Sequence, residues 1–284
     1  MIRKVGIFAI VLLVSAVLFV LALPTLLHTG GLHPAYEGTK YDLTGKRALI
    51  IATNQSVLSA PGETTGKATG VMASEMTVPY YDFQDAGMRV DVASVKGGEV
   101  PIDPQTLSFI IKTPEDERFL ADPAFQEKVE NSLSIDDLDF TQYDIIFMAG
   151  GWGAAYDLGY SQVLGDKISQ AYYAQRPVIG SVCHGALGLI NAKDRDGNLL
   201  ISGRRISGVT NKQIEELGIG LTPQHPETEL RNAGAIYESH SAFLDFFATH
   251  VTIDDERRFV TGQNQNSGHE TAYKLMALVA ERSN

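Results

Sequence analysis

Apolar residues are most concentrated at the N-terminus of the chain. Arg3 and Lys4 come first, and residues 5–27 then contain no charged side chain. At about 1.5 Å per residue, a helix of this length reaches roughly 30 Å, which is the thickness of the hydrocarbon core of a bilayer. The pattern predicts a transmembrane signal anchor over residues 1–28.

Two other interpretations of this run stay open. A cleaved signal peptide has a shorter apolar region of about 7–15 residues and ends at an A-x-A-like site, which is not evident here. A buried helix of a soluble domain is the third interpretation. No Lys or Arg follows Arg3 and Lys4 until Lys40, so the positive-inside tendency predicts a single-pass protein with an extracytoplasmic domain, or a secreted one after cleavage.

A predicted linker over residues 29–40, which contains three glycines and a proline, leads into the rest of the chain. Short β-branched and apolar runs then alternate with helical patterns. Strands are predicted at residues 47–52, 89–93, 143–148, 177–182 and 259–261. Helices are predicted at residues 76–86, 124–133, 161–174, 184–191 and 269–282. This alternation predicts one flavodoxin-like, three-layer α/β domain over residues 41–284, with a mostly parallel sheet.

Composition and charge narrow the class of partner. The 284 residues are 44% hydrophobic and 20% charged, which is typical of a globular domain rather than a disordered chain. The 23 basic and 34 acidic residues give a net charge of −11, which repels phosphate backbones, so no nucleic-acid partner is expected. One cysteine cannot form an internal disulfide.

The strongest chemical signal lies in residues 177–189, PVIGSVCHGALGL. An apolar strand runs into a small-x-Cys-x-small pattern and then a helical one, as in a nucleophile elbow. Ser181 and Gly185 suit so tight a turn. Cys183 would lie just before a helix N-terminus, where unpaired N–H groups favour a thiolate and bring the pKa from about 8.5 to roughly 3.5–7.5. The alternative is a lone cysteine that acts as a small buried hydrophobe.

A second strand, beginning near Asp144, ends in the glycine-rich sequence Gly150-Gly151-Trp152-Gly153. Glycines let backbone N–H groups approach a ligand, so the N–H groups of Gly151 and His184 could form an oxyanion hole. A turn that needs glycine only for its positive φ explains the pattern equally well. The spacing does not match a dinucleotide fingerprint.

With these motifs in view, the sequence resembles the ThiJ/PfpI superfamily, whose fold is like that of class I glutamine amidotransferases. The resemblance covers nearly all of residues 47–282 and is strongest to the chaperone and glutathione-independent glyoxalase branch. It rests on the elbow Cys183-His184-Gly185 and on the glycine-rich turn. Further residues in family order are Glu75, Pro79, Asp85-Ala86-Gly87, Asp91, Lys96-Gly97-Gly98 and Thr261-Gly262-Gln263-Asn264.

The resemblance implies roles for three residues. Cys183 would be the nucleophile, His184 a proton-transfer or orienting partner, and Glu75 the carboxyl that hydrogen-bonds the thiol. An ionised Glu75 would oppose a thiolate, so it helps only when burial keeps it protonated. Spacing alone would make Glu75 an ordinary helix-surface residue. The branch commonly carries a histidine where this chain has Trp152, which bears on substrate preference.

We therefore expect an enzyme that acts on small reactive dicarbonyls, converting methylglyoxal to lactate without metal, glutathione or other cofactor. Deglycation of protein amines and holdase chaperoning are related family activities, and family members are often homodimers. One alternative is a glutamine amidotransferase-like cysteine hydrolase that uses His225 and Glu227, although His225-Pro226-Glu227 also suits the start of a helix. Another is a membrane-tethered, redox-sensing chaperone in which Cys183 is oxidised rather than turned over.

Overall fold

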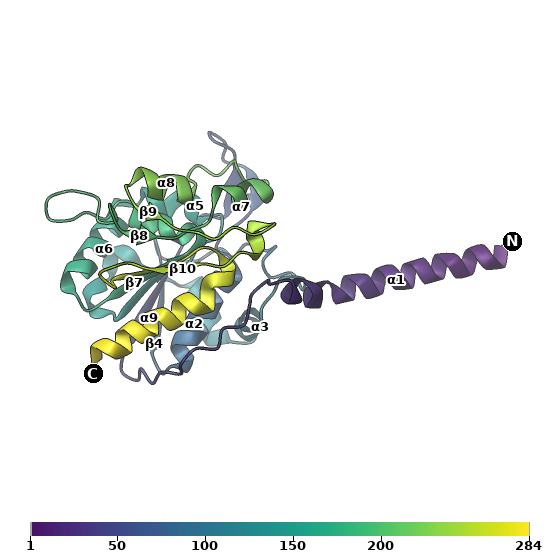
Figure 1. Ribbon diagram of the computed structural model, residues 1–284, viewed down its shortest axis with the longest axis horizontal. Coiled ribbons are helices and arrows are strands. Elements are labelled where there is room, and N and C mark those ends of the chain that lie inside the picture. Colours follow the sequence, from purple (N-terminus) through teal and green to yellow (C-terminus); the bar gives the residue numbers. More distant parts are fainter. Residues whose placement is uncertain (1, 284) are drawn as a thin grey trace.

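The computed structural model describes residues 2–283, with side chains from residue 10 to residue 282. A long helix, α1 (Ile2–Thr29), projects from an α/β domain (Figure 1). Its segment from Ile10 to Thr29 is long and apolar enough to cross a membrane, and none of the segment is buried against the domain.

A seven-stranded sheet lies at the centre of the domain, in the order β10-β11-β7-β6-β1-β4-β5. All neighbouring pairs are parallel except β10 with β11, which confirms the predicted mostly parallel sheet. Strands β6 and β7 are buried along their whole length, as parallel strands covered on both faces are. The strands are β1 (Arg47–Ala52), β4 (Arg89–Ser94), β5 (Leu133–Ser134), β6 (Ile145–Met148), β7 (Val178–Val182), β10 (Val251–Ile253) and β11 (Phe259–Gly262).

Helices cover both faces of this sheet and enclose two separate hydrophobic cores. One core holds side chains of α2 (Ala73–Asp85), α3 (Pro114–Leu120), α4 (Pro123–Glu130) and α9 (Gly268–Ser283). The other holds side chains of α5 (Ala154–Asp157), α6 (Gln162–Ala174) and α8 (Pro226–Asn232). Helix α9 lies so close to β7 that a Cβ at Gly180 would come within 2.5 Å of Leu275, which explains a glycine inside a central strand.

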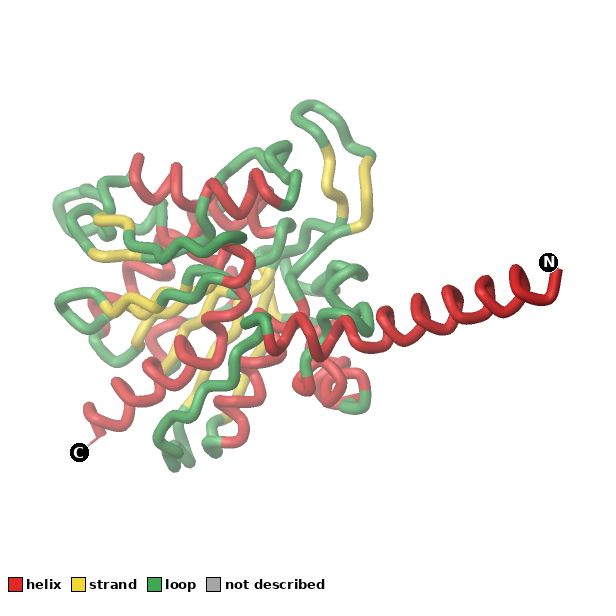
Figure 2. The backbone as a smooth tube through the Cα atoms, turned by 45° about the vertical axis from the view of Figure 1, so that its right-hand side comes forward, coloured by secondary structure: helices red, strands yellow, loops and turns green. Residues whose placement is uncertain are grey.

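The main predicted strands and four of the predicted helices correspond to elements of the structure, but the segment after Cys183 differs. It forms a 3₁₀-helix, η4 (Cys183–Leu189), instead of an α-helix. The sequence patterns also miss α3, α7 (Asn211–Glu216), the hairpin of β2 (Val57–Ser59) and β3 (Gly66–Ala68), and the short parallel pair β8 (Arg205–Ile206) and β9 (Ile236–Tyr237). The remaining 3₁₀ turns are η1 (Ile135–Asp137), η2 (Phe140–Gln142), η3 (Leu158–Tyr160), η5 (Asp245–Phe247) and η6 (Gln265–Ser267). The hairpin extends from the domain on the side from which α1 leaves (Figure 2).

The first residues after α1 are docked on the domain. Leu32 is fully buried, and the N–H of His33 donates to Oδ1 of Asn266 at 2.8 Å. Asn266 belongs to η6, beside the C-terminal end of β11. The end of α1 is therefore fixed to the edge of the sheet at which the parallel strands finish.

Candidate active site

Cys183 is the first residue of η4 and lies at the strained junction with β7. Its φ of 56° lies in the left-handed region, which non-glycine residues adopt at a cost and which a nucleophile elbow requires. A Cβ at Gly185 would lie 2.1 Å from the carbonyl oxygen of Met148 on β6, so the elbow has room only for glycine there. The glycine of the small-residue pattern thus follows from the close approach of η4 to β6.

The structure brings Cys183, His184 and Glu75 together. Sγ of Cys183 lies 3.4 Å from Nδ1 of His184. Glu75, in the first turn of α2, is completely buried and interacts directly with the Cys183 thiol. It is therefore not the helix-surface residue that its spacing alone suggests.

Burial decides the charge of Glu75. It raises the pKa of the carboxyl from 4.5 to about 8, and the Cys183 thiol and the N–H groups of Gly150 and Gly151 offset this only in part. Neither carboxyl oxygen has a well-formed hydrogen bond within the described part of the chain, in keeping with that weak compensation. Glu75 is thus protonated at neutral pH and able to donate a hydrogen bond toward the sulfur.

The prediction of a resting thiolate is wrong. Burial raises the pKa of the Cys183 thiol, ionisation of Glu75 would raise it further, and the N–H groups of His184 and Gly151 lower it by less. Cys183 is 3% exposed and is the first residue of a 3₁₀-helix only seven residues long, so the helix dipole does not outweigh the desolvation of an anion. Cys183 and Glu75 accordingly titrate as a coupled pair.

His184 is a neutral imidazole in this site. Burial, and then the nearby His225, lower its pKa from 6.5 to about 3. The ring of Trp152 stands edge-on to it, with 5.2 Å between the ring centroids. Nε2 of His184 has no hydrogen-bond partner among the residues that the structure describes. Since a neutral imidazole has one basic nitrogen, His184 can accept the thiol proton at Nδ1 in one of its two tautomers.

The backbone donors expected at an oxyanion hole face the same sulfur. The N–H groups of Gly151 and His184 both act on Cys183 and favour its anionic form. Gly151 has a φ of 95°, and a Cβ there would lie 2.3 Å from the backbone nitrogen of Met72. The positive φ and the close contact with Met72 therefore explain the glycine as a turn residue, and the oxyanion hole stays a prediction.

Cys183 opens into a cavity of about 230 Å³. Its walls are mainly apolar and include Met72, Ile111, Trp152, Leu217 and Phe246, with Gln213 and Gln265 among the polar groups. Sequence reasoning identified only Cys183, Gly151 and Trp152 of this lining. Within residues 2–283, no group of His, Cys, Asp and Glu side chains is arranged to hold a metal ion.

The residues considered for an amidotransferase triad take part in the start of a helix. Helix α8 begins at Pro226, and Glu227 lies in its first turn. Glu227 accepts a hydrogen bond from the N–H of Asn211 at 2.9 Å and pairs with Arg231 at 3.0 Å. His225 approaches His184 closely enough to lower its pKa, but its own Nε2 has no partner in the described region. Both residues thus stand at the start of α8, as the helix-start interpretation expects, although the His225 side chain makes no capping hydrogen bond.

Known proteins resemble this chain over most of its length. Glyoxalase 3 of Candida albicans is 30% identical over 221 residues, which are 75% of this chain and 90% of that protein. The glutathione-independent glyoxalase hsp3101 of Schizosaccharomyces pombe is 26% identical over 216 residues, which are 73% of this chain and 86% of that protein.

Solved structures agree with these sequence relatives. The 24 kDa rapid encystment protein of Francisella tularensis superposes with a TM-score of 0.75 at 31% identity, covering 82% of this chain and 99% of that one. Glyoxalase III of Candida albicans gives a TM-score of 0.71 at 26% identity, covering 82% and 97%. The model of the DJ-1/PfpI family matches residues 67–217, which include Glu75, Gly151 and the whole elbow. The chain therefore belongs to the DJ-1/PfpI family.

Proposed function

We propose that this chain is a cofactor-free, cysteine-dependent enzyme that converts small 2-oxoaldehydes such as methylglyoxal to 2-hydroxy acids. The observation that carries this proposal is the position of Cys183 in an apolar cavity, between the neutral imidazole of His184 and the buried acid of Glu75. An enzyme of the glutathione-independent glyoxalase type is also what the names of the curated relatives support.

The reaction would begin with addition of the thiol to the aldehyde carbon. The sulfur forms a C–S bond, Nδ1 of His184 takes the thiol proton, and the carbonyl electron pair moves onto oxygen. The N–H groups of Gly151 and His184 would stabilise that oxyanion, which is then protonated to a hemithioacetal. Protonated Glu75 is suited to give this proton because its pKa is raised to about 8.

Two proton transfers and a hydrolysis complete the conversion. Removal of the proton from the former aldehyde carbon gives an enediol, and protonation of the neighbouring carbon gives a 2-hydroxy thioester of Cys183. Water cleaves the C–S bond of this thioester and releases the 2-hydroxy acid and the thiol. The balance is one substrate and one water per product, with no external oxidant or reductant, and His184 and Glu75 carry the protons.

The tether belongs to the same proposal. Arg3 and Lys4 before an exposed apolar segment support a single-pass anchor with an extracytoplasmic domain. A redox-sensing role has less support, because sensor cysteines combine a low pKa with exposure. Cys183 has a raised pKa and is nearly fully buried.

Turnover tests the enzyme proposal directly. The full chain, incubated with methylglyoxal and no glutathione, should produce lactate detectable by NMR, and Cys183→Ala should abolish it. Ser181→Ala is a matched control in the same elbow, because the Ser181 hydroxyl has no hydrogen-bond partner in the part described. Absence of lactate from the wild type, or equal production by Cys183→Ala, would refute the proposal.

A further inference from the structure

Exposed apolar side chains lie in the same chain segments as several residues that line the Cys183 cavity. Leu217 lines the cavity and is 41% exposed, and Leu221 follows it in the same loop. Phe109 lies two residues from the cavity residue Ile111 and is 53% exposed. Phe243 and Leu244 precede the cavity residue Phe246, and Phe243 is 96% exposed. We call these five residues the rim surface: Phe109, Leu217, Leu221, Phe243 and Leu244.

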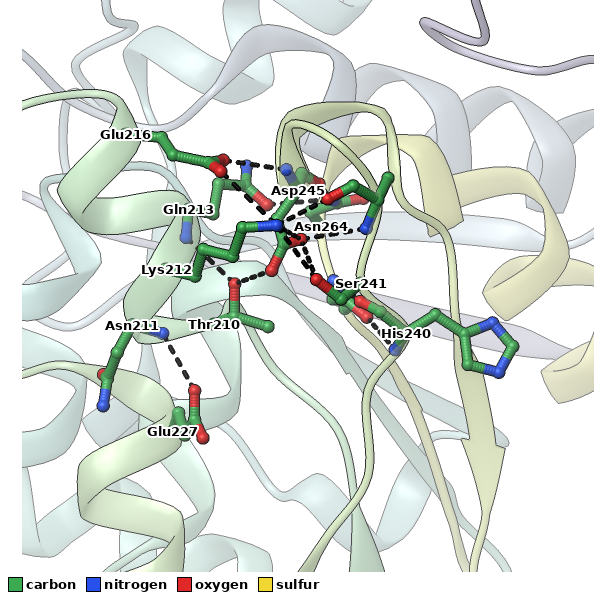
Figure 3. Close-up of polar contacts among 12 residues, drawn as sticks. Thr210, Asn211, Lys212, Gln213, Glu216, Glu227, His240, Ser241, Asp245 and Asn264 are labelled. Carbon is green, nitrogen blue, oxygen red and sulfur yellow. Dashed lines mark hydrogen bonds and ion pairs between the residues drawn. The ribbon is translucent and has the colours of Figure 1, made fainter.

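The loop that carries Phe243 is held firmly at its base (Figure 3). The buried carboxylate of Asp245 accepts hydrogen bonds from Thr210 at 2.8 Å and from Lys212 at 2.9 Å. The N–H of Asp245 in turn donates to Glu216 of α7 at 2.8 Å. Phe243 therefore stays exposed beside a fixed residue, and an exposed large apolar side chain next to a cavity suits an interaction site.

The end of α1 lies at the same edge of the domain. A Cβ at Gly30 would lie 3.9 Å from the ring of Phe247, and His33 is hydrogen-bonded to Asn266. The residues just before these two contacts, Phe246 and Gln265, line the Cys183 cavity and are hydrogen-bonded to each other. Both views of the chain show α1 leaving from the side that carries the loops at the strand ends (Figures 1 and 2).

From this arrangement we propose that the rim surface rests on the lipid surface that α1 enters, so that the Cys183 cavity opens at the membrane interface. The inference rests on the proposed function and extends its substrate class to 2-oxoaldehydes that carry an alkyl chain. Their dicarbonyl end would meet Cys183 while the chain runs past Phe246 and Leu217 toward the bilayer. The reaction is the same, with one water consumed per 2-hydroxy acid formed.

The net charge of the chain and the volume of the cavity agree with a contact between the rim surface and lipid. A net charge of −11 does not draw the domain to anionic lipid, so the contact is apolar and suits a zwitterionic bilayer. A cavity of about 230 Å³ is smaller than the roughly 300–1,000 Å³ of sites for drug-sized ligands. It can enclose a dicarbonyl and the first part of a chain, and the rest would remain in the lipid.

Tryptophan fluorescence tests the contact without relying on activity. In the full chain with Trp152→Phe, the substitution Phe243→Trp supplies the sole tryptophan. Reconstituted in phosphatidylcholine vesicles with brominated acyl chains, this tryptophan should show blue-shifted emission and strong quenching. Ile236→Trp in the same background is the matched control, since Ile236 is 52% exposed and lies on β9, away from α1 (Figure 1). Its tryptophan should not be quenched.

Turnover then tests the substrate class. Phe243→Ser combined with Leu244→Ser should raise the KM for vesicle-borne 2-oxododecanal by roughly tenfold or more, as loss of a buried Phe contact implies. The KM for methylglyoxal should not change.

The outcomes separate the proposals. Equal quenching at positions 243 and 236 on vesicle-bound protein would overturn the rim contact and leave the glyoxalase proposal intact. Failure of the chain to float with vesicles would overturn both the tether and the rim contact. Strong quenching at position 243, together with no lactate formation by the wild-type chain, would support the rim contact and refute the proposed activity. An unchanged KM for 2-oxododecanal in the double variant would overturn the extension to alkyl substrates.

Discussion

Replacing the buried acid Glu75 by glutamine should change how the stability of the domain depends on pH. The pKa of Glu75 is 4.5 in an ordinary setting and about 8 in the folded chain. Between these values the folded chain keeps a proton that the unfolded chain has lost. The stabilisation from this group is therefore fully present below pH 4.5 and disappears as the pH rises through about 8.

The size of the effect follows from the same two values. Each unit of difference in pKa corresponds to about 1.4 kcal/mol, so ionisation of Glu75 costs the folded state roughly 5 kcal/mol between pH 4.5 and pH 8. Glutamine fills nearly the same space and does not ionise. Relative to the wild type, the free energy of unfolding of Glu75→Gln should rise by roughly this amount across that range and level off above pH 8.

Urea unfolding of the full chain in detergent micelles, from pH 5 to pH 9, would measure this difference. The single tryptophan, Trp152, packs against His184 and reports the site directly. Comparison with the wild type removes the contributions of His184 and other groups that titrate in both proteins. Glu117→Gln is the control, because the Glu117 side chain is 67% exposed. A stability difference for Glu75→Gln that does not vary with pH would refute the raised pKa and the proton donation built on it.

Three further outcomes are expected. Alkylation of Cys183 by iodoacetamide should be no faster than that of free cysteine at pH 6 and should stay slower than that of free cysteine at pH 8, because burial and Glu75 raise the pKa of the thiol; rapid reaction at pH 6 would contradict the raised thiol pKa. In thermal unfolding, Gly185→Ala should destabilise the domain by roughly 1–3 kcal/mol through its clash with β6, whereas Gly220→Ala, which meets no atom within 4 Å, should stay within about 0.5 kcal/mol. Trp152→His should raise the KM for 2-oxododecanal more than that for methylglyoxal, because it replaces an apolar wall of the cavity; equal changes would exclude Trp152 from chain recognition.

The sheet and the elbow could be predicted because their signals are local. Strands such as β6 and β7 are buried on both faces and therefore appear as continuous apolar runs. Gly185 follows Cys183 in the pattern that a tight strand-to-helix turn requires, and the structure shows the contact that enforces it. Neither inference needs knowledge of distant parts of the chain.

The environment of Glu75 could not be predicted in this way. Helix α2 lies between the sheet and its neighbouring helices, and ten of its thirteen residues are buried. Such a helix lacks the alternation of apolar and polar faces by which a surface position is distinguished from a buried one. Only the family resemblance indicated a role for Glu75. The cavity residues Ile111, Phe246 and Gln265 have no local signature either, because they come from separate loops that the fold brings together.

The error about the thiolate shows which physical effect controls this site. A helix N-terminus lowers a cysteine pKa when the sulfur remains solvated, but here burial outweighs the dipole and the two N–H groups. Transfer of the proton to His184 before substrate binds is also unfavourable, since its pKa is about 3. In the proposed reaction, the thiol would therefore lose its proton while the C–S bond forms, when negative charge passes to the carbonyl oxygen.

In the proposed reaction, the N–H groups of Gly151 and His184 would then stabilise a charge that exists only while the substrate reacts, and stabilising such a charge is what accelerates a chemical step. A nucleophile that stays protonated until an aldehyde arrives also resists peroxide, because oxidation requires the thiolate. Burial would thus keep Cys183 unreactive until a carbonyl compound is bound beside it. Slow oxidation of Cys183 together with rapid turnover of 2-oxoaldehyde would distinguish this design from that of a redox sensor.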